Sequence, residues 1–209
     1  MIVKFKECTP IITEGLGATL AENHMAPIAK KVVEGSIAPG TVVVLDFDGI
    51  KAVNGSYIKG TALWLWTCGR LSAETKNAIV TPRHQSDPRP YDIYVILSSL
   101  QKEVLTEFRE FLEPRNVPML VGMSIHGDEI ENAILIGRTD PTLQFTFKVV
   151  AELGPCTAPQ LHALFPKLGI TVTAWNNRLN DLHSLRLVRR TRAGRGWTYE
   201  ALAKRILWE

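Results

Sequence analysis

Two runs of apolar, β-branched residues limit what this chain can fold into. Thr41–Phe47 (TVVVLDF) is too apolar for a strand with one side in water, so it predicts a central strand covered on both faces. Asp92–Ser98 (DIYVILS) predicts a second strong strand. Helical segments alternate with these strands, over residues 17–35, from Ser56 to about residue 70, and over Lys102–Leu112. This alternation indicates an α/β layer architecture.

A third strand is predicted over Asn116–Val121 (NVPMLV), and its proline restricts where it can lie. Pro118 has no backbone N–H to donate to a neighbouring strand, which is unfavourable inside a sheet. We therefore expect this strand at the edge of the sheet.

The pattern changes at residues 138–141 (RTDP). Asp140 followed by Pro141 predicts a helix start, with an acidic N-cap and a proline in the first turn. That helix ends near Gly154, and two more are predicted over Thr157–Phe165 and Thr171–Leu185. Two alternating runs around the turn AGRG then predict a β-hairpin. We accordingly expect an α/β domain over residues 1–138 and an α+β domain over residues 139–209.

The charge follows the same division. The 209-residue chain has a net charge of only +3, but residues 141–209 hold ten Lys and Arg against four Asp and Glu, a net +6. Residues 1–140 are left with −3. A basic second half behind an acidic first half is a cue for nucleic-acid binding.

The order of elements in residues 141–209 resembles the winged helix-turn-helix family. The resemblance is carried by the turn PKLGI at 166–170, the third helix VTAWNNRLNDLHSL and the hairpin LVRRTRAGRGWTY. It implies that the third helix enters the major groove of DNA and that the hairpin, the wing, contacts the backbone or the minor groove.

Side-chain chemistry points to the same surface. Asn reads adenine edges, Arg reads guanine or a phosphate, and a dense basic hairpin suits phosphates. The expected DNA-binding residues are Thr173, Asn176, Asn177, Arg178 and Asn180 on the helix and Arg189, Arg190, Arg192 and Arg195 on the hairpin. Two alternatives stay open: the arginines form a solvated face, or the module docks another protein.

The segment VVVLDFDGIKAVNGSYIKGTALWL resembles STAS-like domains, relatives of bacterial anti-sigma-factor antagonists. A buried strand ends in an acidic residue and leads through a hydrophobic loop to a small-residue turn that starts a helix. The resemblance implies a serine at that helix start that accepts phosphate from a partner kinase, and Ser56 takes this position. Asn54 stands where Asp is usual and Gly55 where Ser is usual. We expect Ser56 to be either a helix cap or a phosphoacceptor.

No sequence signature of an enzyme is present, so we expect a non-catalytic protein without a cofactor or a metal. The P-loop, GxSxG, HExxH and GxGxxG patterns are absent. The group HGDE, with His126, Asp128 and Glu129, is explained most simply by a loop. Asp46 and Asp48 are either a cation site or, as we expect, solvated or capping carboxylates. Three scattered cysteines predict a cytoplasmic protein, and the lack of a long apolar run predicts that it does not span a membrane.

These observations lead to two hypotheses from different classes. The first is a transcriptional regulator that binds double-stranded DNA through its winged helix, while the STAS-like domain binds a protein partner or forms a homodimer. The second is a protein-interaction adaptor in a partner-switching or phage-defence system, in which the winged helix is a docking module.

Overall fold

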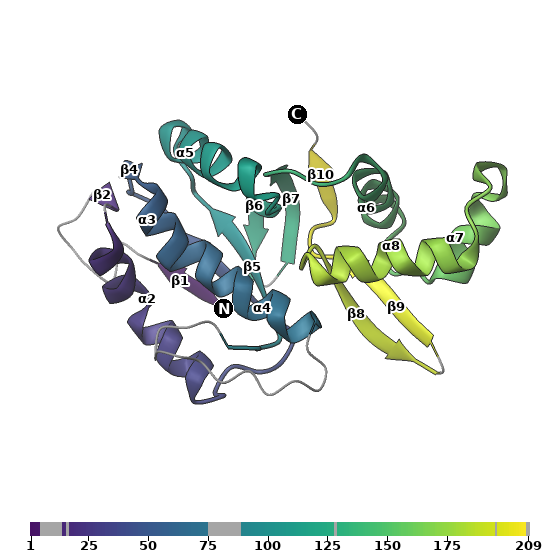
Figure 1. Cartoon of the computed structure of the whole chain (residues 1–209), viewed down its shortest axis with the longest axis horizontal. Coiled ribbons are helices and arrows are strands. Elements are labelled where there is room, and N and C mark those ends of the chain that lie inside the picture. The colour runs from purple at the N-terminus through teal and green to yellow at the C-terminus, as the bar shows by residue number, and fades with distance from the viewer. Residues whose placement is uncertain (5–13, 16, 75–88, 128, 195, 208–209) are drawn as a thin grey trace.

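The computed structural model describes residues 1–4, 14–15, 17–74, 89–127, 129–194 and 196–207, and these form an α/β protein with a mixed sheet (Figure 1). The described strands of the main sheet lie in the order β1 (Ile2–Lys4), β3 (Thr41–Asp46), β5 (Ile93–Ser98), β6 (Met119–His126), β7 (Glu129–Ile136) and β10 (Arg205–Leu207). The first four are mutually parallel, β7 is antiparallel to β6, and β10 is parallel to β7. A separate small sheet pairs β2 (Glu14–Gly15) with β4 (Ala52–Val53).

One face of the main sheet is covered by the helices that connect its strands (Figure 1). They are α2 (Ala18–Val33), α3 (Gly55–Ile58), α4 (Trp64–Glu74) and α5 (Lys102–Leu112), with a π-helical turn at Lys59–Leu63 between α3 and α4. Alternate strand residues, such as Val43 and Leu45 of β3, point into this core beside Phe108 of α5.

The opposite face of the sheet forms a second core with the C-terminal part of the chain. That part contains α6 (Pro141–Leu153), α7 (Ala158–Leu164), α8 (Val172–Ser184), β8 (Val188–Ala193) and β9 (Gly196–Ala201), with a short 3-10 turn at Pro166–Leu168. Val44, Tyr94 and Ile96 of the sheet share one hydrophobic cluster with Phe147 and Trp175. Burial on both faces explains why the middle of β3 and of β5 is apolar at consecutive positions, and the prediction of a central strand at Thr41–Phe47 is confirmed.

The last strand joins the two parts of the chain. β10 pairs with β7, with Arg205 in register with Asn132 (Figure 1). Lys204, just before β10, donates from its backbone N–H to the Ile130 carbonyl and from its ammonium to Glu129 and Glu131 at 2.7 Å. The segment expected as a second domain therefore supplies a strand to the sheet of the first.

The expectation of an edge position for the third strand is wrong. β6 begins at Met119 and lies between β5 and β7, inside the sheet. Pro118 precedes the strand, so its missing N–H removes no hydrogen bond from the ladder. The next strand, β7, has no counterpart in the sequence prediction. His126 ends β6 and Glu129 begins β7, so these two members of the HGDE group belong to strands, while Asp128 lies outside the described residues.

Candidate nucleic-acid interface

Short-range features of the sequence specify the helices of the C-terminal part, through capping residues and apolar spacing. Asp140 caps α6 by accepting the Thr142 backbone N–H at 2.8 Å, as predicted. Thr157 and Gln160 form a reciprocal capping box at the start of α7, and Thr171 caps α8. Along α8, Trp175, Leu179 and Leu182 are fully buried at the predicted spacing of four and three.

The opposite side of α8 presents three of the predicted DNA-reading residues together. Thr173, Asn176 and Asn177 are exposed and lie at helical positions i, i+3 and i+4, which share one face. Their side chains are therefore available to a ligand that approaches α8 from solvent.

Asn180, one turn further along the same face, has a different role from the one expected. Its side-chain oxygen accepts hydrogen bonds from the Tyr199 hydroxyl at 2.9 Å and from Arg190 Nη1 at 3.3 Å. Asn180 thus ties α8 to the hairpin of β8 and β9 instead of standing free to read a base. This contact places the exposed part of α8 next to the hairpin.

The hairpin divides the predicted arginines between its two faces. Arg190 is paired with Tyr199 and Arg192 with Trp197, so these side chains share the face toward Asn180. The guanidinium carbons of Arg190 and Arg192 lie 4.5 Å and 5.0 Å from the Trp197 ring centroid, so both cations rest on one indole.

The remaining predicted arginines are not part of this face. Arg189 precedes Arg190 in β8 and is paired with Glu200 of β9. Because neighbouring residues of a strand point to opposite faces, Arg189 points to the other face of the hairpin. Arg178 is half-buried on α8, with its guanidinium carbon 5.7 Å from the Trp175 ring centroid. Arg195 lies outside the described residues.

A buried arginine at the end of α8 holds this helix against the sheet. Arg186 has a φ of 60°, in the left-handed region, and its side chain is 1% exposed. Its Nε donates to the Ile93 carbonyl at 2.9 Å, its Nη2 forms an ion pair with Asp92, and its guanidinium carbon lies 3.9 Å from the Tyr94 ring centroid. Trp66 of α4 adds a hydrogen bond to the Leu185 carbonyl at 3.2 Å. None of these long-range contacts was predicted.

His183 is buried in the same cluster, and its environment keeps it neutral. Burial, and then the positive charges of Arg186 and Arg190, lower the pKa of His183 to about 4. Its Nδ1 lies 3.4 Å from the Tyr94 hydroxyl and 3.3 Å from the Val188 carbonyl oxygen. The nearby Asp92 charge opposes the shift without cancelling it.

This cluster predicts an acid-sensitive fold. Between the pKa of about 4 in the folded chain and the ordinary value of 6.5, only the unfolded chain protonates this side chain, so stability falls as the pH falls through that window. We expect neutral His183 to contribute about 3 kcal/mol to the free energy of unfolding above pH 6.5, and this contribution to be lost by about pH 4. Urea unfolding of wild type and His183→Gln across this range measures the difference. The exposed His126 provides a matched His126→Gln control, and an equal pH dependence in wild type and His183→Gln contradicts the prediction.

Ser56 lies elsewhere and is not the cap of its helix. The N-cap of α3 is Asn54, whose side-chain oxygen accepts the Tyr57 N–H at 3.0 Å. Ser56 is the second residue of α3 and is exposed. The capping role expected for Ser56 is therefore corrected, because the helix starts at Gly55, two residues earlier than a cap at Ser56 would place it. Its role as a phosphoacceptor stays a prediction.

The described part of the chain contains no group of three or more His, Cys, Asp or Glu side chains placed to hold a metal ion. Nor does it contain a helix long and apolar enough to cross a bilayer. Burial raises the pKa of Cys68 and of Cys156 to about 11, so both thiols stay protonated and weakly nucleophilic.

Comparison with protein-family models, with curated proteins and with solved structures finds no match to this chain.

Proposed function

We propose that this protein is a DNA-binding transcriptional regulator in which residues 139–209 act as a winged helix-turn-helix module. The observation that carries the proposal is the shared surface of α8 and the hairpin. Exposed Asn176 and Asn177 lie on the face of α8 that Asn180 ties to Arg190, beside Arg192. The helix thus offers groups that read base edges, and the hairpin offers cations for phosphates.

The charge distribution supports nucleic acid as the partner. Residues 141–209 carry a net charge of +6, and five of their arginines lie between positions 186 and 195. Of these five, Arg186 is buried and paired within the protein. Arg190 and Arg192 are held on Trp197, so they lose little side-chain freedom when they meet a phosphate. Such cations supply most of the affinity of DNA-binding modules.

For residues 1–138 we propose a STAS-like role in binding a protein partner or in forming a homodimer. A single small module buries little DNA surface, and a dimer reads two half-sites. Ser56, near the start of α3, is exposed and therefore accessible to a kinase. Incubation of the protein in cell extract with ATP, followed by a mass measurement, tests whether Ser56 accepts a phosphate.

The test of base reading uses the two exposed asparagines. Asn176→Ala and Asn177→Ala should change which sequences are retained from a random duplex pool, by about 1–3 kcal/mol of discrimination at the contacted base pair. Affinity for non-specific duplex should stay close to wild type, because neither side chain is charged. The readout is sequencing of retained duplexes. An unchanged preference in both variants removes Asn176 and Asn177 from the reading surface.

One observation favours the adaptor as a second candidate function. Leu164, Leu168 and Val172 are apolar and 58%, 48% and 38% exposed around the turn that leads into α8. Exposed large apolar side chains this close together in the chain suit a protein-docking surface. Failure of the chain to bind duplex DNA even at about 50 mM salt favours this candidate over the regulator.

A further inference from the structure

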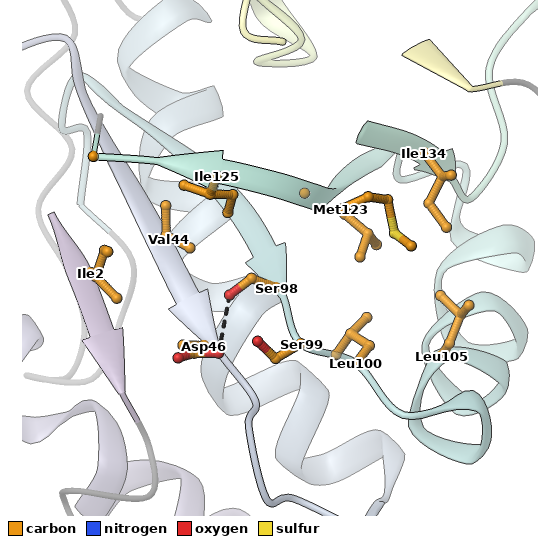
Figure 2. A pocket seen from close by; sticks show the side chains of 13 residues that line it. Ile2, Val44, Asp46, Ser98, Ser99, Leu100, Leu105, Met123, Ile125 and Ile134 are labelled. Carbon is orange, nitrogen blue, oxygen red and sulfur yellow. Dashed lines mark hydrogen bonds between the residues drawn. The ribbon is translucent and has the colours of Figure 1, made fainter. Parts of the chain in front are cut away.

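A hollow of about 490 Å³ lies at the carboxyl ends of the parallel strands β3, β5 and β6 (Figure 2). In open α/β sheets, ligands bind outside the carboxyl ends of the strands, where the loops that leave the strands supply side chains. The volume falls within the range of small-molecule sites, about 300–1,000 Å³. Both its position and its size therefore mark it as a candidate ligand site.

Three oxygen-bearing side chains meet in the hollow, as Figure 2 shows. Asp46 ends β3, Ser98 ends β5, and Ser99 follows it. The Ser98 hydroxyl donates to Asp46 Oδ1 at 3.2 Å, and the Asp48 backbone N–H donates to the same oxygen at 3.3 Å. Among the described residues, these are the hydrogen bonds that Asp46 accepts. They orient the carboxylate and leave its Oδ2 for a donor from outside the protein.

The walls around these oxygens are apolar. Val44 and Ile125 lie on one side, and Leu105 and Ile134 lie on the other (Figure 2). Met123 lines the hollow too and is 58% exposed, which is unusual for so large an apolar side chain. A ligand with an apolar body would cover this surface and remove it from water.

The backbone around the hollow departs from regular geometry at two points. Ser99 has a φ of 57°, in the left-handed region that residues other than glycine and asparagine rarely adopt. In β6 the pairing with β7 shifts register after Gly122, where a Cβ would lie 2.7 Å from Ile125 Cδ1. A left-handed residue other than glycine, such as Ser99, and an irregularity in strand pairing are both enriched at functional sites.

The charge of the lining decides the class of ligand. Asp46 is the one ionisable side chain among the described residues that line the hollow, and Lys, Arg and His are absent from that lining. Within this described lining, no cation would offset the repulsion between Asp46 and a phosphate or carboxylate. We propose that this hollow binds a small organic cation, with its ammonium group on Asp46 and Ser99 and its apolar body between the two walls. The proposal is independent of DNA binding by the C-terminal module.

A charge series on one ring tests the assignment with the full-length chain. Benzylamine, benzyl alcohol and benzoate share a similar apolar body and differ in charge at neutral pH. Benzylamine at millimolar concentration should shift the backbone amide NMR signals of Ser98, Ser99 and Gly122, while benzoate should leave them unchanged. Equal shifts from benzoate or benzyl alcohol, or no shift at these amides from benzylamine, overturn the proposal.

Three variants separate the site from a general charge effect. Asp46→Asn should weaken benzylamine binding by about tenfold or more, because a charge-assisted hydrogen bond becomes a neutral one. Ser99→Gly removes the hydroxyl while the glycine accepts the left-handed backbone, so it weakens binding in a chain that still folds. Glu107→Gln makes the same charge change at an exposed position of α5 outside the lining and should bind as wild type does. Wild-type affinity in both Asp46→Asn and Ser99→Gly rejects the site.

Discussion

Asp92→Ala lowers the free energy of unfolding by about 3 kcal/mol, because it leaves the guanidinium of Arg186 buried without a counter-charge. The Arg186 side chain is 1% exposed, whereas that of Asp92 is 42% exposed, so the arginine is the partner that water cannot rescue. Its remaining contacts, the Ile93 carbonyl and the Tyr94 ring, do not neutralise a full charge. The measurement is urea unfolding at neutral pH, with wild type and variant compared in the same buffer.

A second variant separates charge burial from a loss of packing. Asp92→Ala/Arg186→Met should be more stable than Asp92→Ala alone, because the double variant no longer buries an unpaired cation. Glu74→Ala is the matched control: it breaks the exposed pair with Arg70, whose side chains are 42% and 41% exposed, and should cost less than about 1 kcal/mol. A cost for Asp92→Ala no greater than that for Glu74→Ala contradicts the prediction.

Arg190→Ala/Arg192→Ala weakens binding to all duplex sequences alike and flattens its salt dependence. Each phosphate contact that is lost should reduce the slope of log K against log salt by about 0.9, so the double variant should lose about 2 from the slope. Fluorescence anisotropy with a labelled duplex, titrated at several salt concentrations, gives both the affinity and the slope.

The opposite face of the same strand offers the control for this prediction. Arg189 is the neighbour of Arg190 in sequence but points away from Asn180 and Trp197. Arg189→Ala removes the same charge and should change the slope by less than Arg192→Ala does. Equal losses from Arg189→Ala and Arg192→Ala would show that only the total charge matters and that no single face of the hairpin meets DNA.

Much of the local structure was predictable from the sequence because short-range signals determine it. Thr41–Phe47 and Asp92–Ser98 match β3 and β5 to within one residue at each end, and Lys102–Leu112 matches α5. Asp140 caps α6 as predicted, since an N-cap depends only on its own side chain and the next turn of backbone. The order of strands was harder: whether β6 is an edge or an interior strand depends on a partner, β7, that follows it.

The candidate DNA interface was predictable in its residue types and only partly in its geometry. Helical periodicity correctly placed Asn176 and Asn177 on the exposed face of α8. The same periodicity cannot reveal that Asn180 accepts a hydrogen bond from Tyr199, because that contact comes from a strand 19 residues later. Strand alternation separates Arg189 from Arg190, a signal that the sequence does contain once the hairpin register is known.

The sequence by itself determined the α/β class, the caps of its C-terminal helices and the basic character of the second half, because propensity, capping and charge act over a few residues. Only the tertiary structure decided that β10 completes the sheet beside β7, that Asp92 holds Arg186, and that Asp46 and Ser98 meet in one hollow. Each of these pairs joins residues more than 50 positions apart in the chain. Such contacts arise from the packing of whole elements, for which a local pattern carries no signal.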